Sequence, residues 1–404
     1  MEKPVAAIEF GSKKLKLVVG YELKGQVYVL YALTKPYGHA IEAGSFVEPE
    51  KVVGSVKDIK DIVDASVKLK LTISEALLSL PPYGLEIFQN SQIVTVMSEE
   101  NRIANFDIRN LYALIRNGAS GLSEQLSLVN IVPEQFILDR GRSFVRPPIG
   151  ESSRTLTVSA KVHMMPGKII KDYSNVLTTG GIELKRGFVA PHAAADLIAT
   201  DPNMPKDYFL VDIGSNITTV SLVGGSCLFS SRYFEWGGDR ITEKIIENFN
   251  INEADAEKYK IMYGIDKREM NFKAPVCKVD DGQGNVVKHY TDELNAIIKS
   301  ELDIFLKDLN ATIDTILKTY DYDSTYRNMP MILVGGGSRL FGLIEYITPK
   351  VQSDTVLAYY PKSLGARNAT FTNCLGMILA NSKTPNVYDE SHPRVGQLTR
   401  EEKK

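Results

Sequence analysis

The stretch FLVDIGSNITTVSLV (residues 209–223) contains an apolar strand, a turn that starts at Asp212, and a second apolar strand. Short apolar runs bounded by turn residues predict buried strands. The turn offers donors for phosphate oxygens, namely the amides of Gly214, Ser215 and Asn216 and the hydroxyl of Thr218. Asp212 could hold a water of a hydrated Mg²⁺, which keeps most of its waters. Taken alone, the stretch fits a plain hairpin as well as a phosphate-binding turn.

A similar unit opens the chain. The apolar run PVAAIEF (residues 4–10) leads into GSKK and then into the apolar run LKLVVGYEL. Glu9 takes the position of Asp212 and could also hold a water of Mg²⁺. The groups that could contact a phosphate are Gly11, Ser12, Lys13 and Lys14. Only one of the two lysines is expected to face the ligand, because side chains alternate along a strand. A basic hairpin tip is the alternative.

Two glycine-rich segments follow the second unit's strands. In WGGDRIT, Gly238 and the hydroxyl residue Thr242 are expected near a nucleotide, whereas Asp239 could simply cap the next helix. The other segment is Gly335, Gly336, Gly337 and Ser338, between a buried strand and a predicted helix. Glycines there would let a flat ring approach the backbone, and a helix N-terminus favours anions. A plain strand-to-helix turn would use one glycine.

The chain therefore predicts a duplicated α/β fold, with two units that start near Pro4 and Tyr208 and a ligand in the cleft between them. Between the units, residues 82–165 change to short elements and predict a small α+β insert. In the insert, Asp107 is expected to cap a helix. Apolar spacing predicts a helix from Pro49 through Val67, and a long core helix over 292–320.

Composition excludes several classes of protein. The 404 residues carry a formal net charge of -2, which argues against a bulk electrostatic grip on nucleic acid or anionic lipid. The three cysteines, Cys227, Cys277 and Cys374, form no CxxC spacing, so a reducing compartment fits. No apolar run reaches the ~18 residues that would span a bilayer, and no signal peptide is visible. We expect a cytoplasmic protein.

The order of these motifs is that of the actin/Hsp70/sugar-kinase ATPases. The chain resembles, in particular, the bacterial cell-division actin FtsA family. Its phosphate motifs D-I-G-T-T-K and D-I-G-G-G-T-T-D resemble EFGSKK and DIGSNITTV here, and its V-G-G-D-H-I-T resembles WGGDRIT. The adenosine motif resembles VGGGSRLFGL, and in the insert H-V-I-P-Q-E-Y-I-V-D resembles NIVPEQFILD.

The resemblance implies a domain plan. The first half, 1A, would be 1–81, completed by 166–203 and 354–382; the insert 82–165 would be the family's 1C subdomain. The second half would be 204–353, with 2B at about 249–292, followed by a polar tail, 383–404. The resemblance also implies ATP and Mg²⁺ as cofactors, and Asp212 and Glu9 as catalytic residues.

The resemblance implies partners as well. They are FtsZ, other divisome proteins, and further copies of the chain in protofilaments formed through 1C and the 2A/2B halves, at the inner face of the membrane at the division site. The tail lacks the apolar stripe of the family's membrane helix, so membrane contact is expected to be indirect, or to depend on a helix beyond this sequence.

Departures from the family predict weak or absent ATP hydrolysis. Glu9 replaces an aspartate, Ser215 and Asn216 replace glycines, and Val220 replaces the closing aspartate. Non-glycine residues at positive φ would add strain at about 1 kcal/mol each. Two alternatives stay open: a type IV pilus assembly actin of the PilM kind, and a small-molecule kinase of the superfamily.

Overall fold

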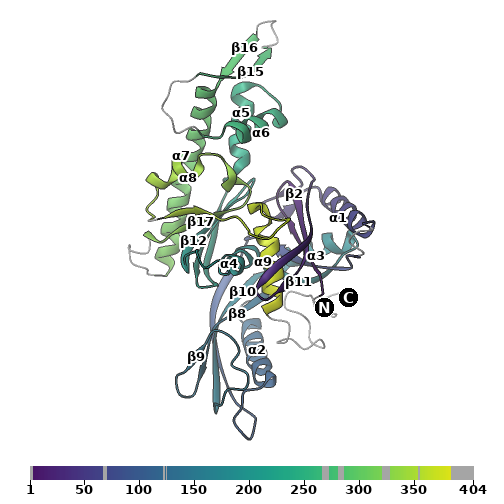
Figure 1. Ribbon diagram of the computed structural model, residues 1–404, viewed down its shortest axis with the longest axis vertical. Helices are drawn as coiled ribbons and strands as arrows, with labels where there is room; N and C mark the ends of the chain where they lie inside the picture. Colours follow the sequence, from purple (N-terminus) through teal and green to yellow (C-terminus); the bar gives the residue numbers. More distant parts are fainter. Residues whose placement is uncertain are drawn as a thin grey trace. The chain divides into compact units, whose positions relative to one another are not determined.

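The computed structural model describes residues 3–66, 71–121, 123, 125–265, 273–280, 286–320, 328–353 and 355–383 (Figure 1). The chain forms two compact units. The first consists of Met1–Lys206, Val223–Ser230 and Pro361–Lys404, and the second of Asp207–Leu222 and Ser231–Tyr360. Val67, the last apolar position of the predicted first helix, lies outside the described residues.

The duplicated α/β plan is confirmed by two five-stranded sheets of the same topology. The first has the order β11-β6-β1-β2-β3 and the second the order β14-β13-β12-β17-β18. If the second order is read backwards, each strand takes the place of one strand of the first sheet, with β12 in the place of β1. In both sheets the three strands at one end are parallel neighbours, as β1 is to β6 and β12 to β17.

The strands of the first sheet are β1 (Val5–Phe10), β2 (Lys14–Leu23), β3 (Gln26–Pro36), β6 (Glu75–Leu80) and β11 (Glu183–Val189). Those of the second are β12 (Asp207–Ile213), β13 (Thr218–Gly224), β14 (Cys227–Phe234), β17 (Met331–Val334) and β18 (Val356–Ala358). A short pair, β4 (Ile41–Glu42) and β5 (Ser45–Phe46), follows β3. β1, β6, β12 and β17 are almost continuous apolar runs, as expected for strands that are buried on both faces.

Helices α1 (Pro49–Asp64), α3 (Gly167–Thr179), α4 (Ala190–Ile198) and α9 (Thr372–Lys383) belong to the first unit, together with the 3-10 turn η4 (Ala369–Phe371). α4 and α9 cross closely, because a Cβ on Gly376 would lie 1.9 Å from the carbonyl oxygen of Ala193. On α1 the predicted stripe of Val52, Val56, Ile59 and Val63 is buried. α9 packs against β1 and β2, the two strands that the turn at residues 11–13 connects.

The insert forms its own small sheet and core. Its elements are β7 (Glu86–Thr95), α2 (Asn105–Ser120), β8 (Leu126–Leu138), β9 (Ser143–Phe144) and β10 (Thr155–Pro166), and the strand order is β7-β10-β8-β9. α2 covers this sheet through Ile108, Leu111 and Ile115. The sequence predicted Asp107 as the N-cap of α2, but the N-cap is Ala104. Asp107 lies in the first turn, where its Oδ2 accepts from the amide of Ala104 at 2.9 Å.

The second unit carries α5 (Gly238–Phe249), α6 (Glu253–Tyr263), the hairpin β15 (Pro275–Asp280) and β16 (Val286–Tyr290), and α7 (Thr291–Thr319). Short turns η2 (Gly337–Arg339), α8 (Leu343–Ile347) and η3 (Thr348–Lys350) follow β17. The long core helix is found as predicted, with Leu294, Phe305 and Ile316 on its buried face. β15 and β16 pair in antiparallel fashion, and residues 281–285 between them lie outside the described residues.

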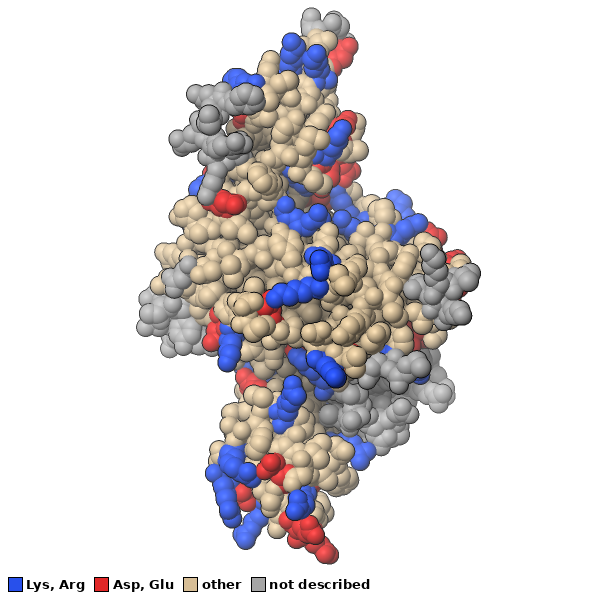
Figure 2. Space-filling model, viewed as in Figure 1, with Lys and Arg blue, Asp and Glu red and all other residues tan. Residues whose placement is uncertain are grey.

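Acidic and basic side chains are interspersed on the molecular face drawn in Figure 2, in keeping with the near-zero net charge. Within the described ranges, no helix combines the length and apolar character that a bilayer span requires.

Candidate nucleotide site

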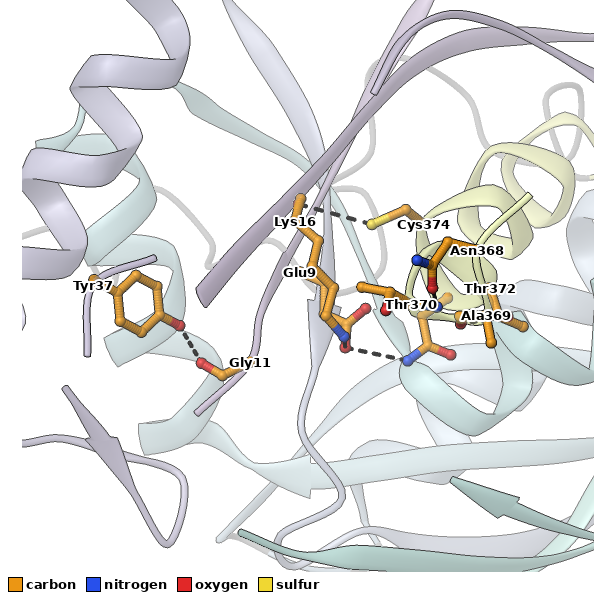
Figure 3. Close-up of polar contacts among 10 residues, drawn as sticks. Glu9, Gly11, Lys16, Tyr37, Asn368, Ala369, Thr370, Thr372 and Cys374 are labelled. Atoms are coloured by element: carbon orange, nitrogen blue, oxygen red, sulfur yellow. Dashed lines mark hydrogen bonds and ion pairs between the residues drawn. The ribbon is translucent and has the colours of Figure 1, made fainter. Parts of the chain in front are cut away.

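The first turn joins β1 to β2 and belongs to the first unit. The amide of Gly11 donates to the carbonyl of Lys14 at 3.1 Å, which closes the turn. Tyr37 fastens it from outside: its amide donates to the carbonyl of Lys13 at 2.9 Å, and its hydroxyl donates to the carbonyl of Gly11 (Figure 3). Burial raises the pKa of Tyr37, so the hydroxyl keeps its proton and remains a donor. Ser12 and Lys13 are half-buried and Lys14 is exposed.

Glu9, on β1 just before this turn, is paired with a lysine that the sequence analysis did not single out. Lys16 is its cross-strand neighbour on β2, and Lys16 Nζ lies 2.7 Å from Glu9 Oε1. The side-chain amide of Asn373, on α9, donates to the same oxygen at 3.3 Å. Both charged side chains are nearly buried, with exposed fractions of 13% for Lys16 and 12% for Glu9. Figure 3 shows Lys16 extended over Glu9 beside α9.

The second turn joins β12 to β13 and belongs to the second unit. It closes in the same way, with the amide of Gly214 donating to the carbonyl of Ile217 at 2.9 Å. The start of α5 is docked on it, because the amides of Gly238 and Asp239 donate to the carbonyls of Gly214 and Ser215 at 3.0 and 2.9 Å. Asp239 is thus the second residue of α5, and Gly237 is the N-cap.

Gly237 is a site residue that the sequence analysis passed over. A Cβ at this position would lie 2.2 Å from the carbonyl oxygen of Ser215. Nearby, the hydroxyl of Thr218 donates to the carbonyl of Trp236 at 2.8 Å, in a buried position. Thr218 therefore binds the WGGD segment to the turn. The pair of glycines in WGGD was the available signal for this close approach.

The prediction of backbone strain in the second turn is wrong. In the part of the chain that the structure describes, the non-glycine residues with positive φ are Lys24, Ala43, Asn101 and Asn250. Ser215 and Asn216 adopt ordinary negative φ, so any residue can occupy these positions without the left-handed penalty. Among the described residues, no hydrogen bond to the amides of Ser215 and Asn216 is found, which leaves both amides as donors for a ligand.

The three consecutive glycines have different roles. Gly335 has φ +83°, and a Cβ there would lie 2.2 Å from Asp212 Oδ1; a Cβ on Gly337 would lie 2.3 Å from Ile213 Cγ2. Both glycines let the backbone after β17 pack directly on the end of β12. A Cβ on Gly336 would meet no described atom within 4 Å, so this glycine alone faces open space.

The segment after β17 is not the helix start that the sequence suggested. Gly337–Arg339 is a single 3-10 turn, and α8 is only Leu343–Ile347. The Ser338 hydroxyl donates to the carbonyl of Gly335 at 2.8 Å and closes that turn. We therefore assign no helix N-terminal anion site to the GGGS segment. Its contribution is the open backbone face at Gly336.

A buried lysine, Lys260 on α6, completes this half of the site. Its Nζ donates to the carbonyl of Gly238 at 3.0 Å and to the hydroxyl of Thr242 at 2.8 Å, and lies 2.5 Å from Glu257 Oε2. Thr242 also donates to Glu257 at 2.7 Å. Neither Lys260 nor Glu257 was among the site residues predicted from the sequence. The three-residue spacing of Glu257 and Lys260 was the signal that both share one face.

Comparisons with known proteins show which proteins the chain resembles in sequence and in fold. The sequence model of the family described as "Cell division protein FtsA" matches residues 209–376, which begin at the strand of the second turn and end within α9. The cell division protein FtsA of Enterococcus faecalis is 22% identical over 386 residues, covering 94% of this chain and 84% of that protein. The resemblance to FtsA is confirmed. The FtsA of Streptococcus pneumoniae is 20% identical over 374 residues, covering 92% of this chain and 78% of its own length.

Solved structures show that the fold is that of the actin-like ATPases. A PilM–PilN type IV pilus biogenesis complex superposes with a TM-score of 0.60 at 17% identity, covering 96% of this chain and all of that one. MreB5 of Spiroplasma citri bound to ADP superposes with a TM-score of 0.54 at 14% identity, covering 95% of this chain and 98% of that one. At these identities the likeness concerns the fold alone.

The two turns differ in how well they suit the ATP and Mg²⁺ that FtsA-type proteins imply. On the second turn, Asp212 is half-buried beside two free amides and the open face of Gly336, which suits phosphates and a hydrated cation. On the first turn, one oxygen of Glu9 is taken by Lys16 and Asn373, and Oε2 is buried without a hydrogen-bond partner among the described residues. Glu9 therefore does not suit a hydrated Mg²⁺. In the described ranges, no group of three or more His, Cys, Asp or Glu is arranged to hold a metal directly.

Proposed function

We propose that this protein is an FtsA-like scaffold of the bacterial division machinery that binds ATP. The observation that carries the proposal is the docking of α5 and of the Gly335–Gly337 segment onto the second turn. Among the described residues, this packing leaves the amides of Ser215 and Asn216 without an acceptor and leaves an open face at Gly336. Backbone amides that converge on one point form a phosphate-binding cradle, and an open glycine admits a flat base.

The proposed roles of the remaining site residues follow from their positions. Gly11, Ser12, Lys13 and Lys14 are proposed to contact phosphates from the first unit, and Asp212 to orient water or a hydrated Mg²⁺. Gly214 and Gly238 would shape the cradle, whereas Ser338, Thr218 and Thr242 support it through bonds within the protein. Glu257 keeps an exposed fraction of 44% and is proposed to accept a hydrogen bond from a nucleotide hydroxyl.

We propose that ATP hydrolysis is weak or absent. Val220 is fully buried in β13, where the FtsA motif ends in an aspartate, so no carboxylate faces the ligand from that position. Glu9, the other candidate catalytic carboxylate, is neutralised by Lys16. Hydrolysis needs a carboxylate that positions the attacking water, whereas binding needs only amides and cations.

Calorimetric titration of the purified chain with ATP tests the nucleotide site. We expect saturable binding that is lost in Gly336→Val, because the new side chain fills the open face, where its Cβ meets no described atom within 4 Å. Gly54→Val on α1 is the matched control, since a Cβ there also meets no described atom within 4 Å. Unchanged binding in Gly336→Val would contradict the proposed site. A turnover assay beside it should show little phosphate release, and Asp212→Ala should abolish what remains.

The partners are proposed from the resemblance to FtsA: the tubulin-like protein FtsZ, other divisome proteins, and further copies of this chain in filaments that form through the insert and the second half. The protein would act at the inner face of the cytoplasmic membrane at the division site. Copurification from cells tests this, with FtsZ as the expected partner. Recovery of an inner-membrane pilus peptide instead would favour a PilM-like role, which the fold alone does not distinguish.

A further inference from the structure

We propose that Lys16 is a resident cation of the first turn, which replaces Mg²⁺ at Glu9 and lets the protein bind ATP without a divalent metal. This inference rests on the proposed nucleotide site. It starts from a mismatch: the resemblance predicts a carboxylate that holds a hydrated cation, and the structure places an ammonium group there.

The first line of argument is that neither oxygen of Glu9 is open to a hydrated ion. Oε1 lies 2.7 Å from Lys16 Nζ and accepts from Asn373 at 3.3 Å. Oε2 is buried from solvent. A Mg²⁺ that keeps its waters binds a carboxylate through those waters, which need space beside an accessible oxygen. Such a complex would require the buried ion pair to break first.

The second line is that the ion pair is built into the sheet. Glu9 and Lys16 are directly opposite each other on the antiparallel strands β1 and β2, at a position where oppositely charged side chains stabilise the pairing. Both side chains are close to nine-tenths buried. Solvent and salt therefore screen the pair much less than they screen a surface pair. Asn373 supports it from α9, which is 364 residues away in the sequence.

The third line is the place of the ammonium group. A Cβ on Gly11 would lie 3.7 Å from Lys16 Cε, so the lysine side chain passes beside the turn that is proposed to contact phosphates. Three lysines and one glutamate give residues 9–16 a formal charge of +2. A carboxylate at this position would repel the phosphates of metal-free ATP. With Lys16 beside it, that repulsion is already cancelled before any metal binds.

The experiment compares ATP affinity in excess Mg²⁺ and in excess EDTA, by titration of the full chain. For the wild type we expect dissociation constants within about threefold of each other, since the resident charge persists in both conditions and Asp212 orients water where no Mg²⁺ is present. In Lys16→Met, which keeps the length of the side chain but removes its charge, we expect affinity in EDTA to fall by about tenfold or more, with recovery in Mg²⁺. Lys16→Arg should behave as the wild type does.

Lys35→Met is the matched control. Lys35 lies on the adjacent strand β3 and forms an exposed ion pair with Asp58, so its loss should leave both affinities unchanged. A wild type that loses ATP in EDTA would overturn the inference and leave the proposed nucleotide site standing. An equal fall in the ATP affinity of Lys16→Met in Mg²⁺ and in EDTA would also overturn the inference, because the ion pair would then have only a structural role. A wild type that binds no ATP in either condition would instead overturn the proposed function. The wild-type comparison needs no variant, so the test holds even if Lys16→Met fails to fold.

Discussion

The two turns start from the same strand–turn–strand pattern but are stabilised in different ways. The first, around Gly11, is held by side chains: Tyr37 binds its carbonyls, and Lys16 neutralises its carboxylate. The second, around Gly214, is held by backbone packing of α5 and of the glycines after β17. Residues 9–16 carry a formal charge of +2, whereas residues 212–219 carry −1. The two turns thus share the backbone hydrogen bond that closes them but differ in charge.

The largest effect is expected where backbone packing is tightest, at Gly335. An alanine would place Cβ 2.2 Å from Asp212 Oδ1 and 2.6 Å from the carbonyl of Ile213, at φ +83°. We expect the free energy of unfolding to fall by about 3 kcal/mol, from the left-handed penalty and overpacking together. Gly336→Ala is the matched control and should stay within about 0.5 kcal/mol. Urea unfolding measures both, and equal losses would refute the different roles of the two glycines.

The next largest effect is a loss of stability at acid pH that is expected in the first unit. His192 on α4, in the first unit, is buried; desolvation, with help from Lys383 and Arg186, lowers its pKa to about 3. Since an unfolded histidine titrates near ~6.5, the unfolded state binds more protons between about pH 3 and 6.5, and stability is lost as pH falls through that window. We expect the first unit to lose about 2 kcal/mol between about pH 7.5 and 5 through this residue.

Circular dichroism and tryptophan fluorescence can follow this loss separately. The single tryptophan, Trp236, lies in the second unit, so its fluorescence reports on that unit. The acid-induced loss should appear in circular dichroism and be reduced in His192→Gln. An unchanged pH dependence in this variant would assign the loss to other groups.

The smallest effects compare the hydrogen bonds that fasten each turn. Thr218→Val removes the donor to the carbonyl of Trp236 at a fully buried position, and should cost about 2 kcal/mol. Tyr37→Phe removes the donor to the carbonyl of Gly11. Because Gly11 is half-buried, water can replace part of this hydrogen bond, and the substitution should cost about 1 kcal/mol. Unfolding curves for the two variants test this order. A larger loss of unfolding free energy in Tyr37→Phe than in Thr218→Val would contradict this order.

Several features of the site were accessible from local patterns. The strand–turn–strand units, the order of the glycine motifs and the long helix α7 all follow from runs of apolar residues and their spacing. The boundaries of short elements were less accessible. Asp107 and Asp239 suit an N-cap by type but are the third residue of α2 and the second residue of α5, because tertiary docking of the preceding segment sets where each helix begins.

The sequence by itself determined the duplication, the two turns and the family resemblance, because these depend on residue type, on local spacing and on the order of motifs along the chain. Only the tertiary structure decided which groups at each turn remain open to a ligand. Glu9 forms an ion pair with Lys16 across a hairpin and accepts a hydrogen bond from Asn373, near the other end of the sequence. Gly335 and Gly337 pack directly against the end of β12. Such partners are brought together by the packing of sheets and helices. Residue type and spacing therefore predict a phosphate turn but not its charge.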